Sequence, residues 1–210
     1  MRVLIINSSF QYNQMFAEAG FQIVDDIAKA ELLCFTGGAD VTPRLYGDKA
    51  HPQTGNSEFR DAQEQTWFNR AKAAGIPMVG ICRGGQFLNV MSGGRMYQHV
   101  EEHCGDHDIV DLLSGETILV SSTHHQMMLP SPKGFLVASS TLLGQREWYD
   151  GQIAKRDVSK EDIEVVYYKH TKSLCFQPHP EFTSPHYRGM REYFFKCMER
   201  FLNVQIAETA

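Results

Sequence analysis

The sequence of 210 residues lacks any apolar run that approaches the roughly 20 residues needed for a membrane-spanning helix. It lacks a cationic leader with a cleavage site after Met1, which argues against a signal peptide. With a net charge of −5, it also lacks the basic excess of a general nucleic-acid binder. These absences predict a cytoplasmic protein that contacts neither a membrane nor nucleic acid.

Paired cysteines are missing as well. The five cysteines are odd in number, are scattered along the chain and form no CxxC pair. This pattern fits a reducing compartment rather than a disulfide framework. The chain also lacks repeats, low-complexity tracts and an evident linker, and its 42% hydrophobic and 21% charged residues are ordinary for a globular protein. We therefore expect a single domain over residues 1–210.

Short apolar runs alternate with helical patterns in the first half, whereas the second half is mostly strand-like and ends in a helix. Strands alternating with helices predict an α/β fold with a doubly wound, mostly parallel sheet flanked by helices. Active sites in such sheets gather at the carboxyl ends of the strands. The predicted strands are 2–6, 21–24, 31–35, 77–81, 117–121, 135–139, 163–168 and 173–177, and the predicted helices are 11–19, 57–74, 84–91 and 187–202.

The strongest local signal is a cysteine between two glycines, at the junction of a predicted strand and a predicted helix: Gly80-Ile81-Cys82-Arg83-Gly84. This spacing is typical of a nucleophile elbow, whose flanking glycines avoid a clash that a β-carbon would cause. Cys82 would then lie at a helix N-terminus, where the helix dipole favours the thiolate. The backbone N–H of Arg83 would form one half of an oxyanion hole. On its own, such a pattern more often marks a buried structural cysteine.

A thiolate nucleophile usually works with a histidine whose tautomer is fixed by a further group. His179-Pro180-Glu181 follows a predicted strand and supplies both, with Glu181 able to accept from the His179 imidazole. In a chain with nine histidines, this pair is weak support by itself. Together with Cys82, it predicts nucleophilic catalysis.

Taken together, the motifs resemble those of class I glutamine amidotransferases. They are most similar to the γ-glutamyl hydrolase branch, which contains γ-glutamyl-γ-aminobutyrate hydrolase. The resemblance spans residues 35–181, most of the chain. Five segments carry it in the same order: Thr36-Gly37-Gly38-Ala39-Asp40-Val41-Thr42-Pro43, Arg60-Asp61 with Glu64, Gly80-Ile81-Cys82-Arg83-Gly84-Gly85-Gln86, Ser121-Ser122-Thr123-His124-His125-Gln126, and Gln177-Pro178-His179-Pro180-Glu181.

The resemblance implies a flavodoxin-like class I glutamine amidotransferase domain that cleaves a small γ-glutamyl amide. Cys82 would attack the γ-glutamyl carbonyl to form a thioester, and His179, oriented by Glu181, would act as base and then as acid. Gly37 or Gly38 would donate the second oxyanion N–H. The resemblance implies no cofactor and no metal, and it assigns substrate contacts to Gln86, Thr123, His124 and His125.

Departures from the family pattern bear on the substrate. Pro178 replaces the usual Trp, Ser121 stands where Asn is common, and Thr36 replaces a Pro. The segment before Gly37 is also short for the hydrolase branch.

Two other functions stay open at this point: a glutaminase component that passes ammonia to a synthetase or ligase partner, and a non-catalytic binding module. The sequence also leaves open whether the chain is a homodimer.

Three further groups of residues favour ordinary interpretations. His99, His103, Cys104 and His107 match no established zinc spacing, so we expect no metal there. Arg60, Asp61 and Glu64 fit a helix-start ion pair at least as well as a substrate contact. The charged residues of 155–164 predict a solvated loop.

Overall fold

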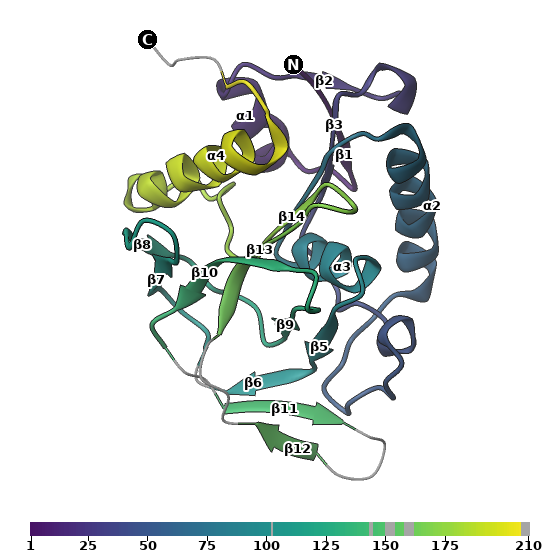
Figure 1. The fold of residues 1–210 in the computed structure, drawn as a ribbon, viewed down its shortest axis with the longest axis vertical. Coiled ribbons are helices and arrows are strands. Elements are labelled where there is room, and N and C mark those ends of the chain that lie inside the picture. Colours follow the sequence, from purple (N-terminus) through teal and green to yellow (C-terminus); the bar gives the residue numbers. More distant parts are fainter. Residues whose placement is uncertain (102, 143–144, 150–153, 158–161, 207–210) are drawn as a thin grey trace.

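The computed structural model describes residues 1–101, 103–142, 145–149, 154–157 and 162–206. A nine-stranded mixed sheet forms its centre (Figure 1). This confirms the α/β class that the sequence predicts. In spatial order, the strands are β2 (Gln22–Val24), β1 (Arg2–Ile6), β3 (Leu32–Phe35), β4 (Met78–Ile81), β14 (Ser173–Phe176), β13 (Ile163–Tyr168), β10 (Phe135–Ser140), β7 (His107–Asp111) and β8 (Thr117–Val120).

The two halves of this sheet differ in strand direction. From β2 to β14 every pairing is parallel, whereas from β14 to β8 every pairing is antiparallel. Within the parallel half, β3, β4 and β14 are buried on both faces, as their nearly continuous apolar runs predict.

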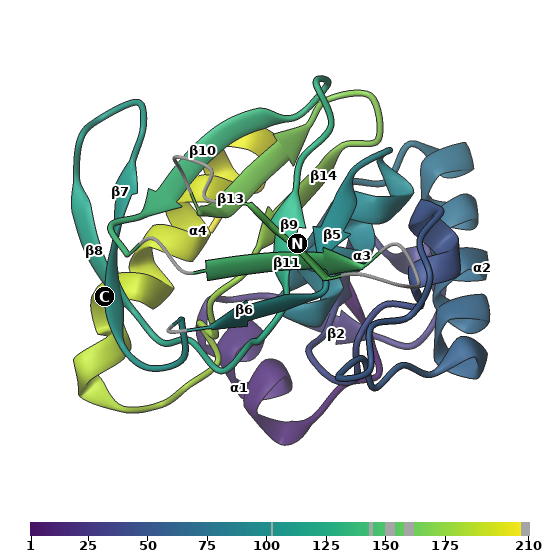
Figure 2. The same ribbon diagram turned by 90° about the horizontal axis from the view of Figure 1, so that it is seen from below.

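Helices cover both faces of the sheet (Figures 1 and 2). One face packs against α1 (Phe10–Glu18) and α4 (Arg188–Leu202), and the other against α2 (Glu58–Ala74) and α3 (Arg83–Met91). Because successive strand residues point to opposite faces, Val3 and Ile5 join the first core and Leu4 and Ile6 the second. Among the described residues, no helix is long and apolar enough to cross a membrane.

Smaller elements lie at one end of the sheet. β6 (His99–Glu101), β11 (Gln145–Tyr149) and β12 (Ala154–Asp157) form a three-stranded sheet, and β5 (Arg95–Tyr97) pairs with β9 (Met127–Leu129) (Figure 1). Short 3-10 helices span Ile27–Lys29, Pro43–Tyr46 and Pro185–Tyr187. The expected solvated loop over 155–164 is wrong at both ends, because β12 covers its start and Asp162 and Glu164 are fully buried. Residues 158–161 of that stretch lie outside the described part.

Strand register brings three loops to one edge of the parallel half. Ile6 pairs with Phe35, Phe35 with Gly80, and Ile81 with Phe176. The residues that follow β3, β4 and β14 therefore lie side by side, and the Cys82 N–H donates to the Phe176 carbonyl over 2.8 Å.

Candidate active site

Cys82 occupies a strained turn between β4 and α3. Its φ of 50° and ψ of −115° are unusual for a residue with a side chain. A β-carbon on Gly80 would lie 2.2 Å from the Gly84 carbonyl oxygen, and one on Gly84 would lie 2.1 Å from the Phe35 oxygen. Only glycine fits at either position, so the sequence pattern and the tight turn explain each other.

His179 lies at the carboxyl end of the neighbouring strand β14. Its Nδ1 is 2.7 Å from Glu181 Oε1, and the carboxylate can only accept, so Nδ1 carries the proton. The ring stacks on Phe182 with centroids 4.8 Å apart. Its backbone N–H points at Ser121 Oγ over 3.4 Å. These contacts fix the imidazole in the plane that leaves Nε2 directed away from Glu181.

The His179 imidazole is more basic than a free one. Burial by itself disfavours the imidazolium, but hydrogen bonding and charge from Cys82 and Glu181 outweigh it and raise the pKa of His179 to about 10. A positive imidazole beside the sulfur is the setting in which a cysteine becomes a nucleophile. The site is recessed rather than sealed, since Cys82 and His179 each keep 8% of their surface exposed.

The Gly37-Gly38 loop forms the third side of the site. A β-carbon on Gly37 would lie 3.4 Å from His179 Cε1 and 3.8 Å from Cys82 Cβ, so the glycine loop, His179 and the elbow meet there. The Gly37 N–H donates to the Tyr12 hydroxyl over 3.1 Å. Gly38 has a φ of 144°, and a β-carbon there would collide with the Arg60 guanidinium. Among the described residues, no hydrogen-bond acceptor is recorded for the Gly38 N–H.

A buried ion-pair network holds this loop against the elbow. The Arg83 side chain pairs with Asp61 and Glu64 of α2, and its Nε donates to the Ala39 carbonyl over 3.1 Å. Arg60 binds Glu64 over 2.8 Å and the Thr36 carbonyl over 2.9 Å. Asp61 and Glu64 of α2 thus form ion pairs with Arg83 of the elbow, and Arg60 binds the glycine loop at Thr36. Helix α2 therefore connects the elbow to the glycine loop.

Comparison with known proteins identifies the fold and relatives of the chain. The Peptidase C26 family matches residues 17–112. A putative glutamine amidotransferase-like protein YvdE from Lactococcus lactis is 30% identical over 158 residues, which cover 72% of this chain and 66% of that protein. The structure of a glutamine amidotransferase from Thermotoga maritima superposes with a TM-score of 0.64 at 15% identity, over 98% of this chain and 86% of that one.

The chain is a relative of glutamine amidotransferase-like proteins and has the fold of solved glutamine amidotransferases. A carbamoyl phosphate synthase small chain from Polynucleobacter asymbioticus is also similar, with 30% identity over 129 residues, or 60% of this chain and 28% of that protein. The present chain spans only 24% and 36% of the length of two further glutamine amidotransferase-like relatives. Its own substrate and partners are therefore matters for proposal.

The residues expected to contact substrate do not all face Cys82. The exposed Thr123 places its hydroxyl 2.8 Å from His179 Nε2. His125 is partly exposed, with Nε2 3.2 Å from Asp40 Oδ2. Gln86 is buried behind the elbow, where its amide donates to the Gln126 carbonyl over 3.1 Å.

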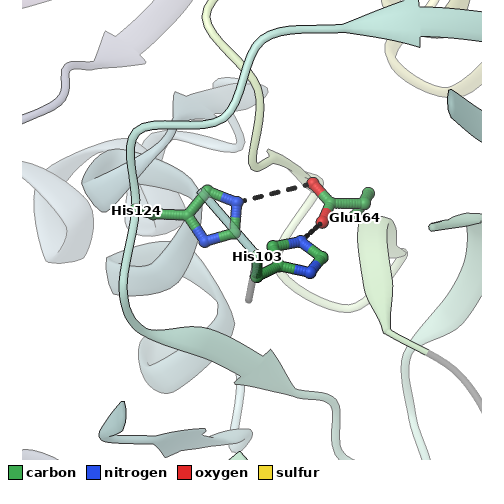
Figure 3. A group of neighbouring side chains, drawn as sticks. All are labelled: His103, His124 and Glu164. Carbon is green, nitrogen blue, oxygen red and sulfur yellow. Dashed lines mark hydrogen bonds and ion pairs between the residues drawn. The ribbon is translucent and has the colours of Figure 1, made fainter. Parts of the chain in front are cut away.

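His124 lies apart from this group. It is buried and points at Glu164 in the interior (Figure 3). Its neighbours differ in burial, since Thr123 is exposed and His125 is partly exposed. The sequence Thr123-His124-His125 gives no signal that would separate His124 from the other two.

Sequence reasoning missed one residue that contacts the site. Tyr12, at the start of α1, accepts the Gly37 N–H. Burial, with the charge of Glu181 adding to it, raises the pKa of Tyr12 well above its ordinary value, so the phenol stays protonated. Tyr12 therefore connects the glycine loop to the His179 side of the site. Its aromatic side chain in an amphipathic helix looked like an ordinary core residue.

Proposed function

We propose that the chain hydrolyses a γ-glutamyl amide bond through a thioester on Cys82. The observation that carries the proposal is the meeting of a cysteine on a strained elbow with a histidine that is bonded to a carboxylate. That arrangement is what acyl transfer requires: a nucleophile, a base whose tautomer is fixed, and a nearby site for the oxyanion.

In the proposed reaction, the Cys82 sulfur forms a bond to the δ-carbonyl carbon of the γ-glutamyl group, and the carbonyl π electrons move onto oxygen. His179 Nε2 delivers its proton to the leaving nitrogen as the C–N bond breaks. Water then attacks the thioester and gives one proton to His179, and the tetrahedral adduct expels the sulfur to release glutamate. Glu181 keeps the proton on Nδ1 throughout and stabilises the imidazolium.

Two backbone N–H groups are proposed to bind the oxyanion. Arg83 is the first residue of α3, so its N–H has no partner within the helix. We assign the second donor to Gly38, because the Gly37 N–H already binds Tyr12. Loss of one such donor typically costs about 10²–10³ in kcat, so the network that fixes the loop matters for rate.

The glutamyl end of the substrate is proposed to bind between Asp40 and His125. The bond from His125 to Asp40 raises the pKa of His125 against the effect of burial. An imidazole and a carboxylate side by side suit the α-carboxylate and the α-ammonium of a glutamyl group.

A second candidate is the glutaminase component of an amidotransferase, which would pass ammonia to a synthetase. The similarity to a carbamoyl phosphate synthase small chain favours it. Both candidates use the same chemistry at Cys82 and differ in what accepts the nitrogen. Glutamine turnover that is near zero for the chain alone and strong with a partner would select this candidate over a free-standing hydrolase.

The test is a panel of γ-glutamyl amides, including glutamine, with free glutamate as the readout. We expect the wild type to turn over at least one of them and Cys82→Ala to lose about 10⁴-fold or more. Cys104→Ala is the matched control, since Cys104 is an exposed thiol outside the site. Mass spectrometry of the rapidly quenched wild type should show the glutamyl adduct on Cys82. Equal turnover by wild type and Cys82→Ala would refute the mechanism.

A further inference from the structure

A second cluster of histidines and carboxylates lies inside the protein near the proposed site. His103 precedes β7, His107 begins it, His124 follows β8, and Glu164 is the second residue of β13. None of these four residues keeps more than 5% of its surface exposed. Figure 3 shows that His103 and His124 both point at the Glu164 carboxylate.

Hydrogen bonds to backbone carbonyls fix the tautomers of two of these histidines. His124 Nδ1 lies 2.9 Å from the Gln126 oxygen, and His107 Nδ1 lies 3.2 Å from the Gly105 oxygen. A carbonyl oxygen can only accept, so both Nδ1 atoms carry the proton. In this tautomer, each ring presents a lone pair on Nε2.

Both lone pairs face the same carboxylate. His124 Nε2 is 3.8 Å from Glu164 Oε2, and His107 Nε2 is 3.7 Å from Oε1. These distances are too long for hydrogen bonds, and neither Nε2 atom nor Oε2 has a hydrogen-bond partner among the described residues. Buried acceptors that face one another without a donor between them are costly, since each loses its water and gains repulsion.

His103 compensates only part of the negative charge of the Glu164 carboxylate. Its Nε2 is 2.7 Å from Glu164 Oε1, and its Nδ1 is 3.5 Å from Asp162 Oδ2. The proton of His124 lies on Nδ1 and points at the Gln126 carbonyl, away from the Glu164 carboxylate. The Oε2 side of the carboxylate, which faces His124, stays uncompensated.

We propose that this cluster binds a divalent transition-metal ion of the zinc type through His103, His124 and Glu164, with His107 as the fourth ligand. The donor atoms of the first three already lie within 4.8 Å of one another. Imidazole nitrogen and carboxylate oxygen are preferred zinc ligands at about 2.0–2.2 Å. Ligands of one tetrahedral ion then lie about 3.4 Å apart, so the widest gap must shorten by about 1.4 Å. The ion takes the place of the proton between His103 and Glu164.

The surroundings match those of known metal sites. A metal-binding histidine usually donates its other ring N–H to a carbonyl or a carboxylate, as His107 and His124 do here. Four protein ligands in a buried setting make a closed site, which is structural rather than catalytic. The ion would fix the loop that carries Thr123, whose hydroxyl touches His179. The ligands come from separate segments of the chain, so no zinc-binding sequence motif predicts them.

The first test measures zinc content. The untagged wild type is loaded with Zn²⁺, dialysed and analysed by elemental mass spectrometry beside His124→Gln, Glu164→Gln and His186→Gln. His186 is an exposed histidine that pairs with Asp106, so its variant controls for surface zinc. We expect about one zinc per chain in the wild type and in His186→Gln, and a loss to background in the other two. Equal zinc in all four proteins would overturn the proposal.

The second test uses the wild type alone and so does not depend on whether the variants fold. Zn²⁺ should raise the thermal midpoint, a chelator should lower it, and Co²⁺ should give the visible spectrum of tetrahedral coordination. A wild type that keeps no metal and shows no shift would overturn the proposal and leave a proton or a water molecule between the acceptors. Neither readout involves turnover, so the result is independent of the function proposed for Cys82.

Discussion

Two histidine–glutamate pairs lie at the same edge of the sheet, and they are built differently. At His179, both ring nitrogens have partners: Glu181 on one side, and Thr123 and Cys82 on the other. At His124, one nitrogen binds a carbonyl and the other faces Glu164 without a hydrogen. We therefore propose that the first pair holds and moves a proton, whereas the second holds a cation.

The position of each pair in the sheet explains the difference. His179 follows the last parallel strand, where the loops open toward solvent at the strand ends. Glu164 is the second residue of an antiparallel strand and is covered by the loops before β7 and after β8, so it is fully buried. One segment joins the two sites, since Thr123 touches His179 and the next residue, His124, faces Glu164.

The largest expected effect separates the two histidines by activity. His179→Gln should lower kcat by about 10³–10⁴, because it removes both the base and the acid of the proposed reaction. His124→Gln should change kcat far less and should act on metal content and stability. Steady-state kinetics on the best γ-glutamyl amide, with circular dichroism to verify folding, measures both. Similar kcat losses in folded His179→Gln and His124→Gln would show that the two histidines do not differ in their role in the reaction.

The two glutamates should differ in the opposite sense. Glu164→Gln removes the carboxylate that three histidines face, so the free energy of unfolding should fall by about 3–5 kcal/mol. Glu181→Gln, at a more open pair, should cost less stability and more kcat. Urea unfolding followed by fluorescence compares the two variants with the wild type. A Glu164→Gln protein as stable as the wild type would show that the cluster contributes nothing to folding.

A smaller effect concerns pH. The pKa of His179 is raised from 6.5 to about 10, so the folded protein keeps a proton that the unfolded chain has lost across that range. The stabilisation is complete below about pH 6.5 and is lost as pH rises through about 10. The stability advantage of the wild type over His179→Gln should therefore shrink from pH 6.5 to 10, as measured by urea unfolding. An advantage that grows with pH would contradict the raised pKa.

Local signals in the sequence were enough for the parallel half. Apolar runs such as 2–6 and 77–81, and the glycine that ends α2, are decided by neighbouring residues, and the structure has them within one residue. The glycines on either side of Cys82 are explained by sterics, since a β-carbon on Gly80 or Gly84 would clash with backbone atoms. The position of His179 followed from a general rule about strand ends. Its catalytic role stays a prediction.

The antiparallel strands β8, β10 and β13 were also predicted, but the small sheets beside them and the histidine cluster could not be predicted in this way. The short strands β5, β6 and β9 have little periodicity, and their pairing depends on contacts distant in sequence. Glu164 sits in a charged stretch that predicts exposure, yet its partners come from two other loops. A polar residue becomes a core residue here because the fold supplies histidines around it, and no local pattern records that.

The smallest expected effect tests the segment between the two sites. Thr123→Val keeps the shape of the side chain but removes the hydroxyl that lies 2.8 Å from His179 Nε2. One hydrogen bond typically contributes about 0.5–1.5 kcal/mol net, so kcat should fall by about 2- to 10-fold. Thr123→Ser keeps the hydroxyl and should restore most of the rate. A positioning role lowers kcat at constant KM, whereas a substrate contact raises KM. Unchanged kinetics in Thr123→Val would mean that Glu181 and Phe182 suffice to hold the His179 imidazole. The histidine cluster around Glu164 would then have no influence on Cys82 and His179 through the loop that carries Thr123.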